Sequence, residues 1–170
     1  MTKKKPTPKK KLGKQPNEDR SSTPAVESDA ELRERAFLIS DIVEIKSLTL
    51  IECAASRSSH LPEGGKRKAE LAVTKVAHVL SEEEHELQVQ IEFGLTIKPV
   101  DSGDQKLEVK ATFAINYSMK GSAEFAQPEY QAFAELNGVH NAWPFWREFV
   151  LNLTSRMGIR PIVIPVHRVG

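Results

Sequence analysis

The stretch "ELQVQIEFGLTIKPVDSGDQKLEVKATFAINYSM" (residues 86–119) decides the fold. It holds two runs in which apolar and polar residues alternate, which is the period of a strand with one buried face. A turn-forming "PVDSG" (99–103) separates them, so the sequence predicts two neighbouring antiparallel strands. The apolar positions are Leu87, Val89, Ile91, Phe93, Leu95 and Ile97, then Leu107, Val109, Ala111, Phe113, Ile115, Tyr117 and Met119.

Two more strands are predicted upstream of this pair. Residues 69–81 are apolar on both faces, and the charged turn "SEEEH" joins them to residue 86, which completes an antiparallel meander. Residues 36–56 are rich in β-forming residues. The apolar residues occupy odd-numbered positions at first (Phe37, Ile39, Val43 and Ile45) and even-numbered positions afterwards (Leu48 and Leu50). This change of parity predicts a bulge near residues 46–47. The loop 57–68 is too long for a tight hairpin, so the first two strands need not be neighbours.

A change of period after residue 119 predicts helices. Pro128 suits a first helical turn, apolar residues follow at helical spacing, and "NG" (137–138) predicts the end of that helix. A second helix is predicted with Asn141 as N-cap, Pro144 in the first turn and Gly158 just past its end. Pro161 and Pro165 then favour an extended segment. The predicted fold class is α+β, a four-stranded antiparallel sheet followed by two helices.

The second helix, "HNAWPFWREFVLNLTSRMG" (140–158), carries more apolar surface than one small sheet needs. At ~100° per residue its apolar side chains span ~160°, whereas a helix resting on a sheet needs a stripe of ~100°. Leu151 lies outside this arc, Trp143 at its edge and Trp146 near its centre. The helix is therefore either fully buried in an ordinary core or also faces another subunit or an apolar ligand.

Composition indicates one globular domain with a tail. The chain has 170 residues, 39% apolar and 28% charged, and a net charge of +1. Residues 1–35 are lysine-rich and almost free of branched aliphatic residues, which predicts a disordered basic tail before a domain at 36–170. The tail is either a solubilising segment or a weak contact for RNA or anionic lipid, although no aromatic residue is interleaved for base stacking.

The sequence contains no pattern typical of catalysis or of cofactor binding. The five histidines are scattered, and one cysteine completes neither a zinc site nor a disulfide. No phosphate-binding loop is present, Cys53 is expected to be a small buried thiol, and Arg147 with Glu148 is expected to form an ion pair or a cap. We expect no enzyme activity, no cofactor and no metal. The absence of a signal-peptide run and of a membrane span predicts a cytoplasmic protein.

The end of the chain resembles the SecB family of export chaperones. The stretch "HNAWPFWREFVLNLTSRMGIRPIVIPV" (140–166) carries the family's order of an aromatic group, a proline, Arg-Glu, an apolar helix, an arginine and a Pro-rich extended segment. The "YQAFA…NG" stretch before it is more similar to solitary SecB-like chaperones, including those linked to toxin–antitoxin systems. The matching residues are Pro144, Phe145, Arg147, Glu148, Arg156, Pro161 and Pro165.

The resemblance implies an ATP-independent holdase, assembled as a dimer of dimers, that binds unfolded polypeptides or preproteins in apolar grooves. The alternative is a dedicated accessory chaperone or adaptor for one partner such as an antitoxin. Leu151 is the expected subunit contact. The expected client-binding residues are Leu48, Leu50, Tyr117, Tyr130, Phe133, Trp143, Phe145 and Trp146.

Two departures from the family concern the partner. In the export chaperone a further C-terminal helix and a polar tail contact the translocase motor SecA, whereas this sequence stops at Gly170. The export chaperone is also strongly acidic, whereas this chain is near neutral with a basic tail. Both departures argue against docking to SecA and favour a different or dedicated partner.

Overall fold

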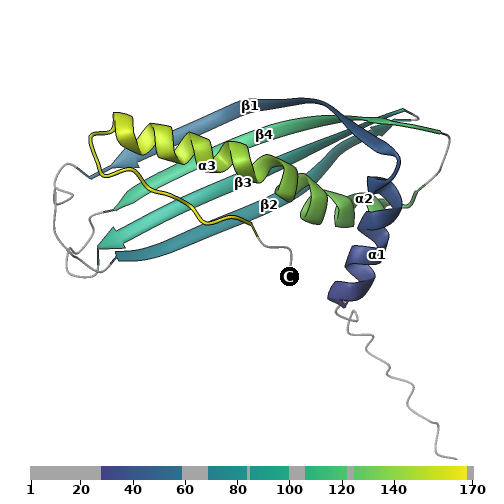
Figure 1. Cartoon of the computed structure of the whole chain (residues 1–170), viewed down its shortest axis with the longest axis horizontal. Helices are drawn as coiled ribbons and strands as arrows, with labels where there is room; N and C mark the ends of the chain where they lie inside the picture. The colour runs from purple at the N-terminus through teal and green to yellow at the C-terminus, as the bar shows by residue number, and fades with distance from the viewer. Residues whose placement is uncertain (1–27, 59–68, 84, 100–105, 122–124, 168–170) are drawn as a thin grey trace, which may run out of the picture.

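A four-stranded antiparallel sheet forms the body of the molecule (Figure 1). The computed structural model describes residues 28–58, 69–83, 85–99, 106–121 and 125–167. The strands β1 (Val43–Arg57), β2 (Ala69–Glu83), β3 (Glu86–Pro99) and β4 (Leu107–Met119) lie in the order β1-β4-β3-β2. The predicted meander is confirmed, and β1 pairs with β4 rather than with β2.

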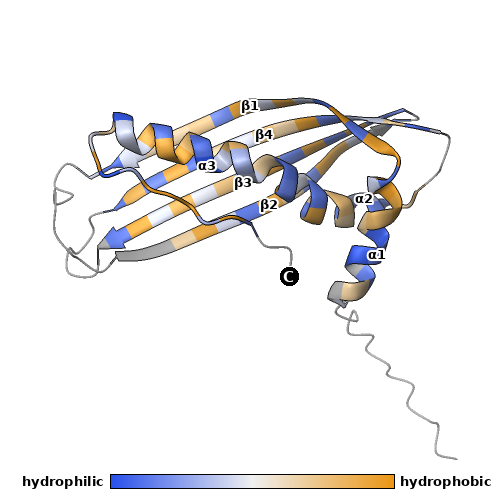
Figure 2. Ribbon diagram, viewed as in Figure 1, coloured by the Kyte–Doolittle hydropathy of each residue, from blue (hydrophilic) through white to orange (hydrophobic). Residues whose placement is uncertain are grey.

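One face of the sheet forms the core. In β3 and β4 every residue of the predicted apolar face is buried except Ile97, which is half-buried. The helix α3 (Val139–Arg156) crosses this inner face, and the strands alternate in hydropathy beneath it (Figure 2). The predicted fold class is thereby confirmed. None of the helices among the described residues is long and apolar enough to cross a membrane.

Two bulges keep the apolar side chains of β1 on the inner face. The register with β4 shifts between Ile45 and Ser47 and again between Leu50 and Glu52. The first shift is the predicted bulge. Each shift adds one residue to β1 and so restores the alternation that the sequence interrupts. The residues of β1 that pair with inner-face residues of β4 are Val43, Ile45, Leu48, Leu50, Cys53, Ala55 and Arg57.

The two predicted helices are one continuous helical run. The helix α2 (Gln127–Phe133) has Pro128 in its first turn, as predicted, and a π-helical segment, η1 (Ala134–Gly138), leads directly into α3. The predicted break at Asn137–Gly138 is wrong, since Gly138 has helical angles. Asn141 is consequently not an N-cap, and Pro144 lies inside α3, where it removes one helical hydrogen bond.

A helix that was not predicted precedes the sheet. The helix α1 (Asp29–Ser40) begins with a capping box in which Ser28 and Glu31 bond to each other's backbone. Ala36 and Ile39 are buried, and their spacing of three places them on one face of a helix, whereas in a strand they would point to opposite faces. The strand assignment of Phe37 and Ile39 is therefore wrong, and α1 begins within the residues 1–35 that were assigned to the tail. Residues 1–27 lie outside the described part of the chain.

The end of α3 matches the prediction. Gly158 has φ +67°, the left-handed conformation that favours glycine after a helix. Its N–H donates to the carbonyl of Ser155, and the N–H of Ile159 donates to the carbonyl of Thr154. Residues 159–167, which we call the C-terminal segment, then return along α3 without helix or strand structure.

Candidate functional site

Three stripes of α3 have three different surroundings. The central stripe, spaced by four residues, is fully buried against the sheet: Ala142, Trp146, Val150 and Thr154. Trp146 stacks on Phe93 of β3 with ring centroids 5.4 Å apart. The centre of the wide apolar arc is therefore ordinary core, and the two flanks decide what else the helix does.

The C-terminal segment covers the first flank of α3. Arg147 Nε donates to the carbonyl of Ile164 (2.7 Å), and Trp143 Nε1 donates to the carbonyl of Pro165 (2.8 Å). The N–H of Ile162 donates to the buried hydroxyl of Thr154 (3.1 Å). Ile164 is itself buried. This flank of the helix is therefore closed within the monomer.

The second flank faces an uncovered groove beside β1. We call it the β1–α3 groove, and it encloses about 320 Å³. Its apolar lining comes from three elements: Leu48 and Leu50 of β1, Phe113 of β4, and Phe145, Phe149 and Leu153 of α3. Glu148, Asn152 and Arg156 add polar groups from α3. Phe145 and Leu50 remain 47% and 40% exposed, which is unusual for side chains of this size.

The apolar surface continues along β1 beyond the groove. β1 is an edge strand, so one row of its backbone hydrogen-bonding groups has no neighbouring strand among the described residues. Ile45, on the inner face, is also about half exposed. A groove floored by large apolar side chains and bordered by a free strand edge suits an extended polypeptide with apolar side chains.

The structure brings together three of the predicted client-binding residues and separates the others. Leu48, Leu50 and Phe145 line the β1–α3 groove together. Trp143 lies on the opposite flank of α3, half-buried under the C-terminal segment. Leu151 is exposed on α3 and lines neither flank.

Four predicted client-binding residues are buried and form no accessible surface of the monomer: Tyr117, Tyr130, Phe133 and Trp146. Tyr117 packs edge-on against Phe133 with centroids 5.1 Å apart and accepts a hydrogen bond from Asn141 Nδ2 (3.0 Å). Burial raises the pKa of Tyr117 to about 12. These four side chains lie in the core of the monomer, and aromatic periodicity does not distinguish a core position from a client-binding one.

Several groove residues were missed by sequence reasoning. Phe149 and Leu153 fell within the apolar arc, and Phe113 on an alternating strand, but periodicity does not say which edge of an arc is left open. The spacing of Glu148, Asn152 and Arg156 could have identified them. They lie three or four residues from one another or from Phe145 and Phe149, which places all five on the same side of the helix.

Other expectations about reactive groups were partly wrong. Cys53 is exposed rather than buried, because it lies on the uncovered inner face of β1. Arg147 and Glu148 do not pair with each other: Arg147 anchors the C-terminal segment, and Glu148 accepts a bond from Asn152 (3.3 Å). Within the described ranges no three His, Cys, Asp or Glu side chains are grouped to hold a metal ion.

Comparison with known proteins identifies the fold. No protein-family model matches the sequence, and no curated protein matches it either. A SecB-like chaperone of Mycobacterium tuberculosis, solved in complex with a ChAD peptide from the HigA1 antitoxin, superposes with a TM-score of 0.70. It is 17% identical, and the match covers 81% of this chain and 99% of that chain.

A protein of unknown function from Streptococcus agalactiae also matches, with a TM-score of 0.45 and 10% identity over 72% of this chain and 96% of that one. The similarity to the mycobacterial protein extends over nearly all of that protein's length. The chain therefore has the fold of a SecB-like chaperone.

Proposed function

We propose that this protein is an ATP-independent holdase that binds unfolded or aggregation-prone polypeptides in the β1–α3 groove. The observation that carries the proposal is the uncovered groove itself, in which apolar residues of three elements form the lining and Leu50 of β1 and Phe145 of α3 are exposed to solvent. Holding an apolar segment requires exposed apolar surface and no reacting group, which agrees with a chaperone that is not an enzyme. The cytoplasm is the compartment in which we expect it to act.

The proposal predicts that the groove, rather than apolar surface in general, protects a client. Leu50→Ser and Phe145→Ser remove exposed groove side chains, whereas Val76→Ser removes a side chain of similar exposure, 48%, from the outer face of β2. Because truncating an anchoring side chain costs more than ~1 kcal/mol, both groove variants should need about fivefold to tenfold more protein for equal protection.

The measurement is light scattering from a heat-unfolded reporter enzyme with full-length chaperone and no nucleotide. Urea unfolding of each variant shows that the fold is kept. Wild-type protein without effect would contradict the holdase, and equal losses in Val76→Ser and the groove variants would contradict the groove.

A second candidate is a dedicated chaperone or adaptor for one partner, such as an antitoxin. It is favoured by one observation: the similar mycobacterial chaperone was solved with an antitoxin peptide. Capture from native lysate with wild-type protein and Phe145→Ser distinguishes the two. Many polypeptides lost together in the variant support the general holdase, and one abundant partner supports the dedicated chaperone.

A further inference from the structure

The polar residues of the β1–α3 groove form a row along its α3 side. Glu148, Asn152 and Arg156 recur at every fourth position of the helix, and all three are exposed. We call these three residues the rim of the groove. Eight positions of helix separate Glu148 from Arg156, which puts their Cα atoms about 12 Å apart. The rim therefore presents a carboxylate, an amide and a guanidinium in that order.

The two charges of the rim are not neutralised within the described part of the chain. Glu148 accepts one hydrogen bond, from the uncharged amide of Asn152 (3.3 Å). Arg156 has no hydrogen-bond or ion-pair partner among the described residues. The carbonyl of Met157, at the end of α3, is bonded by Arg57 Nη1 instead (2.6 Å). Both charges are therefore open to a ligand that lies in the groove.

The other charged side chains of β1, β4 and α3 do not contribute to the groove lining. They bond elsewhere or belong to the outer face of the sheet: Arg57 and Arg147 donate to carbonyls, Glu44, Lys46 and Glu108 pair with Lys120, Glu86 and Lys106, and Glu52 and Lys110 alternate with inner-face residues. Glu148 and Arg156 are thus the charged groups that the described lining offers to a ligand.

The floor of the groove has the repeat of an extended chain. Leu48 and Leu50 are two residues apart on the inner face of β1, so their side chains repeat at about 7 Å. Alternate residues of an extended ligand have the same repeat, so two of its apolar side chains can face the floor together while the residues between and beside them point away from it. Over the ~12 Å from Glu148 to Arg156, an extended segment advances about four residues.

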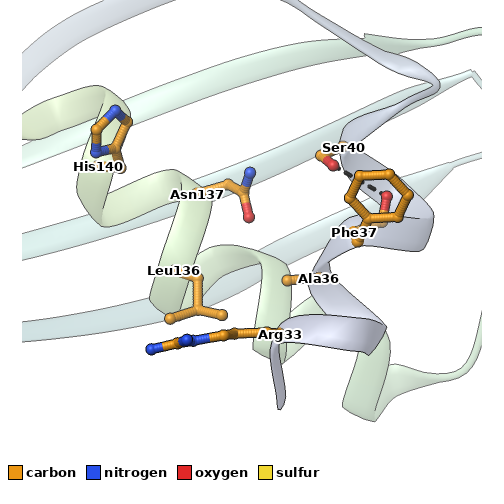
Figure 3. Close-up of a pocket in the computed structure, with 7 residues that line it drawn as sticks. All are labelled: Arg33, Ala36, Phe37, Ser40, Leu136, Asn137 and His140. Atoms are coloured by element: carbon orange, nitrogen blue, oxygen red, sulfur yellow. Dashed lines mark hydrogen bonds between the residues drawn. The ribbon is translucent and has the colours of Figure 1, made fainter. Parts of the chain in front are cut away.

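A second hollow, between α1 and η1, lacks this pair of opposite charges (Figure 3). It encloses about 240 Å³, and its lining holds the exposed Arg33 beside Phe37 and Leu136 but no carboxylate. Its Ser40 hydroxyl donates to the carbonyl of Phe37 (2.9 Å), as the dashed line in Figure 3 shows. Arg33 is thus an exposed arginine beside apolar surface away from the groove, which makes it a matched control for Arg156.

We propose that the β1–α3 groove selects extended client segments of the pattern basic–apolar–polar–apolar–acidic. The two apolar residues face Leu48 and Leu50, and the polar residue between them lies beside Asn152. The basic and acidic side chains, four positions apart, pair with Glu148 and Arg156, so the order of the two charges sets the direction in which the segment lies. This inference rests on the proposed function, since it concerns which segment the holdase prefers rather than whether it holds one.

The test compares four dye-labelled, end-blocked peptides by fluorescence anisotropy with full-length protein. The first is Gly-Ser-Lys-Phe-Ser-Leu-Glu-Ser-Gly, and the others carry lysine, glutamate or glutamine at both charged positions. Wild type should bind the mixed-charge peptide about threefold to fivefold more tightly than each of the others, as exposed charge pairs allow. The preference should fade as salt rises. Leu50→Ser should weaken all four peptides alike, because it alters only the floor.

Charge reversal on the rim tests each residue separately. Arg156→Glu should shift the preference to the lysine peptide, and Glu148→Lys should shift it to the glutamate peptide, because each variant presents two like charges. Combining both substitutions should restore the preference for the mixed-charge peptide. Arg33→Glu, away from the groove, should leave the preference unchanged. Melting temperatures equal to that of wild type show that the variants keep the fold.

Three results would overturn the charge selection. Equal affinity for the four peptides, or a change of preference in Arg33→Glu as large as that in Arg156→Glu, would do so while protection of the reporter enzyme continues. Absence of saturable binding would do so as well, and the light-scattering assay decides separately whether the holdase fails with it. A lower oligomeric mass of Glu148→Lys with unchanged peptide affinities would assign the rim to contact with a second copy of the chain.

Discussion

At the scale of single residues, Tyr117 couples the sheet to the helix through one polar contact in an apolar environment. Its ring is buried on β4, and its hydroxyl accepts the hydrogen bond from Asn141 of α3. Burial disfavours the phenolate strongly, and this effect outweighs the favourable hydrogen bond from the amide. The neutral phenol is therefore the form that the folded protein requires.

Stability should accordingly fall in strongly alkaline solution. The pKa of Tyr117 is raised from 10 to about 12, so between these values the native state binds more protons than the unfolded chain. The free energy of unfolding then decreases as pH rises, by up to about 2–3 kcal/mol at pH 12, and the contribution is intact below pH 10. Urea unfolding of wild type and Tyr117→Phe at several pH values measures it. Parallel pH profiles of the two proteins would contradict this prediction.

The two tryptophans show what single positions of a sequence can predict. Angular position on the helix placed Trp146 near the centre of the apolar arc, and it is fully buried. The same reasoning placed Trp143 at the exposed edge, but the carbonyl of Pro165 and the His167 ring cover it. The covering segment has no periodic pattern and docks through side-chain bonds to its backbone, so the sequence gives no signal of its position.

At the scale of elements, Thr154 fastens the C-terminal segment to α3. Its buried hydroxyl donates to the carbonyl of Val150 (2.8 Å) and accepts from the N–H of Ile162. Thr154→Val keeps the shape but leaves that N–H without an acceptor, so we expect a loss of about 1–3 kcal/mol and faster amide exchange at Ile162. Thr154→Ser keeps the hydroxyl and should keep the protection of Ile162. Slow exchange in the valine variant would show that another group holds the segment.

The helical run shows why elements were better predicted than their ends. The strands followed from alternation over many residues, whereas the helix break rested on Asn137 and Gly138 alone. Glycine at position 138 reflects close packing rather than a helix end. A Cβ there would lie 3.1 Å from Ile91 Cδ1 and 3.2 Å from Val89 Cγ1. The helical run approaches β3 so closely that Ile91 and Val89 would have to shift by a few tenths of an ångström to admit a Cβ. A glycine at a close approach and a glycine at a helix end look the same in a sequence.

At the scale of the whole molecule, the inner face of the sheet is covered unequally. The C-terminal segment closes one flank of α3, and the other flank remains open along β1. Ile45, Leu50 and Phe145 are exposed on this side, and Leu151 is exposed elsewhere on α3, so the monomer presents apolar surface that association could cover. Self-association is therefore expected, in agreement with the dimer of dimers that the SecB resemblance implies.

Light scattering of the full-length protein at micromolar concentration should give a mass well above 19.0 kDa. Leu151→Glu should lower that mass without unfolding the chain, because Leu151 is already 37% exposed and a carboxylate opposes burial in an interface. Asn152→Glu, a neighbouring exposed position on the groove flank, is the control for added charge. A monomeric wild type would contradict the assembly, and an unchanged Leu151→Glu would place the contact elsewhere on the molecule.

The two bulges of β1 also bear on fibre formation. A long flat edge strand with apolar side chains is a template on which further chains can stack without limit. In β1 the bulges divide the edge into runs of regular pairing at 43–45, 47–50 and 52–57, and the longest run, "ECAASR", is rich in alanine and charged at both ends. Cross-β stacking favours uninterrupted segments of about six strongly β-forming residues, and no run of β1 offers one. The strand can thus keep its apolar surface open while resisting growth into amyloid.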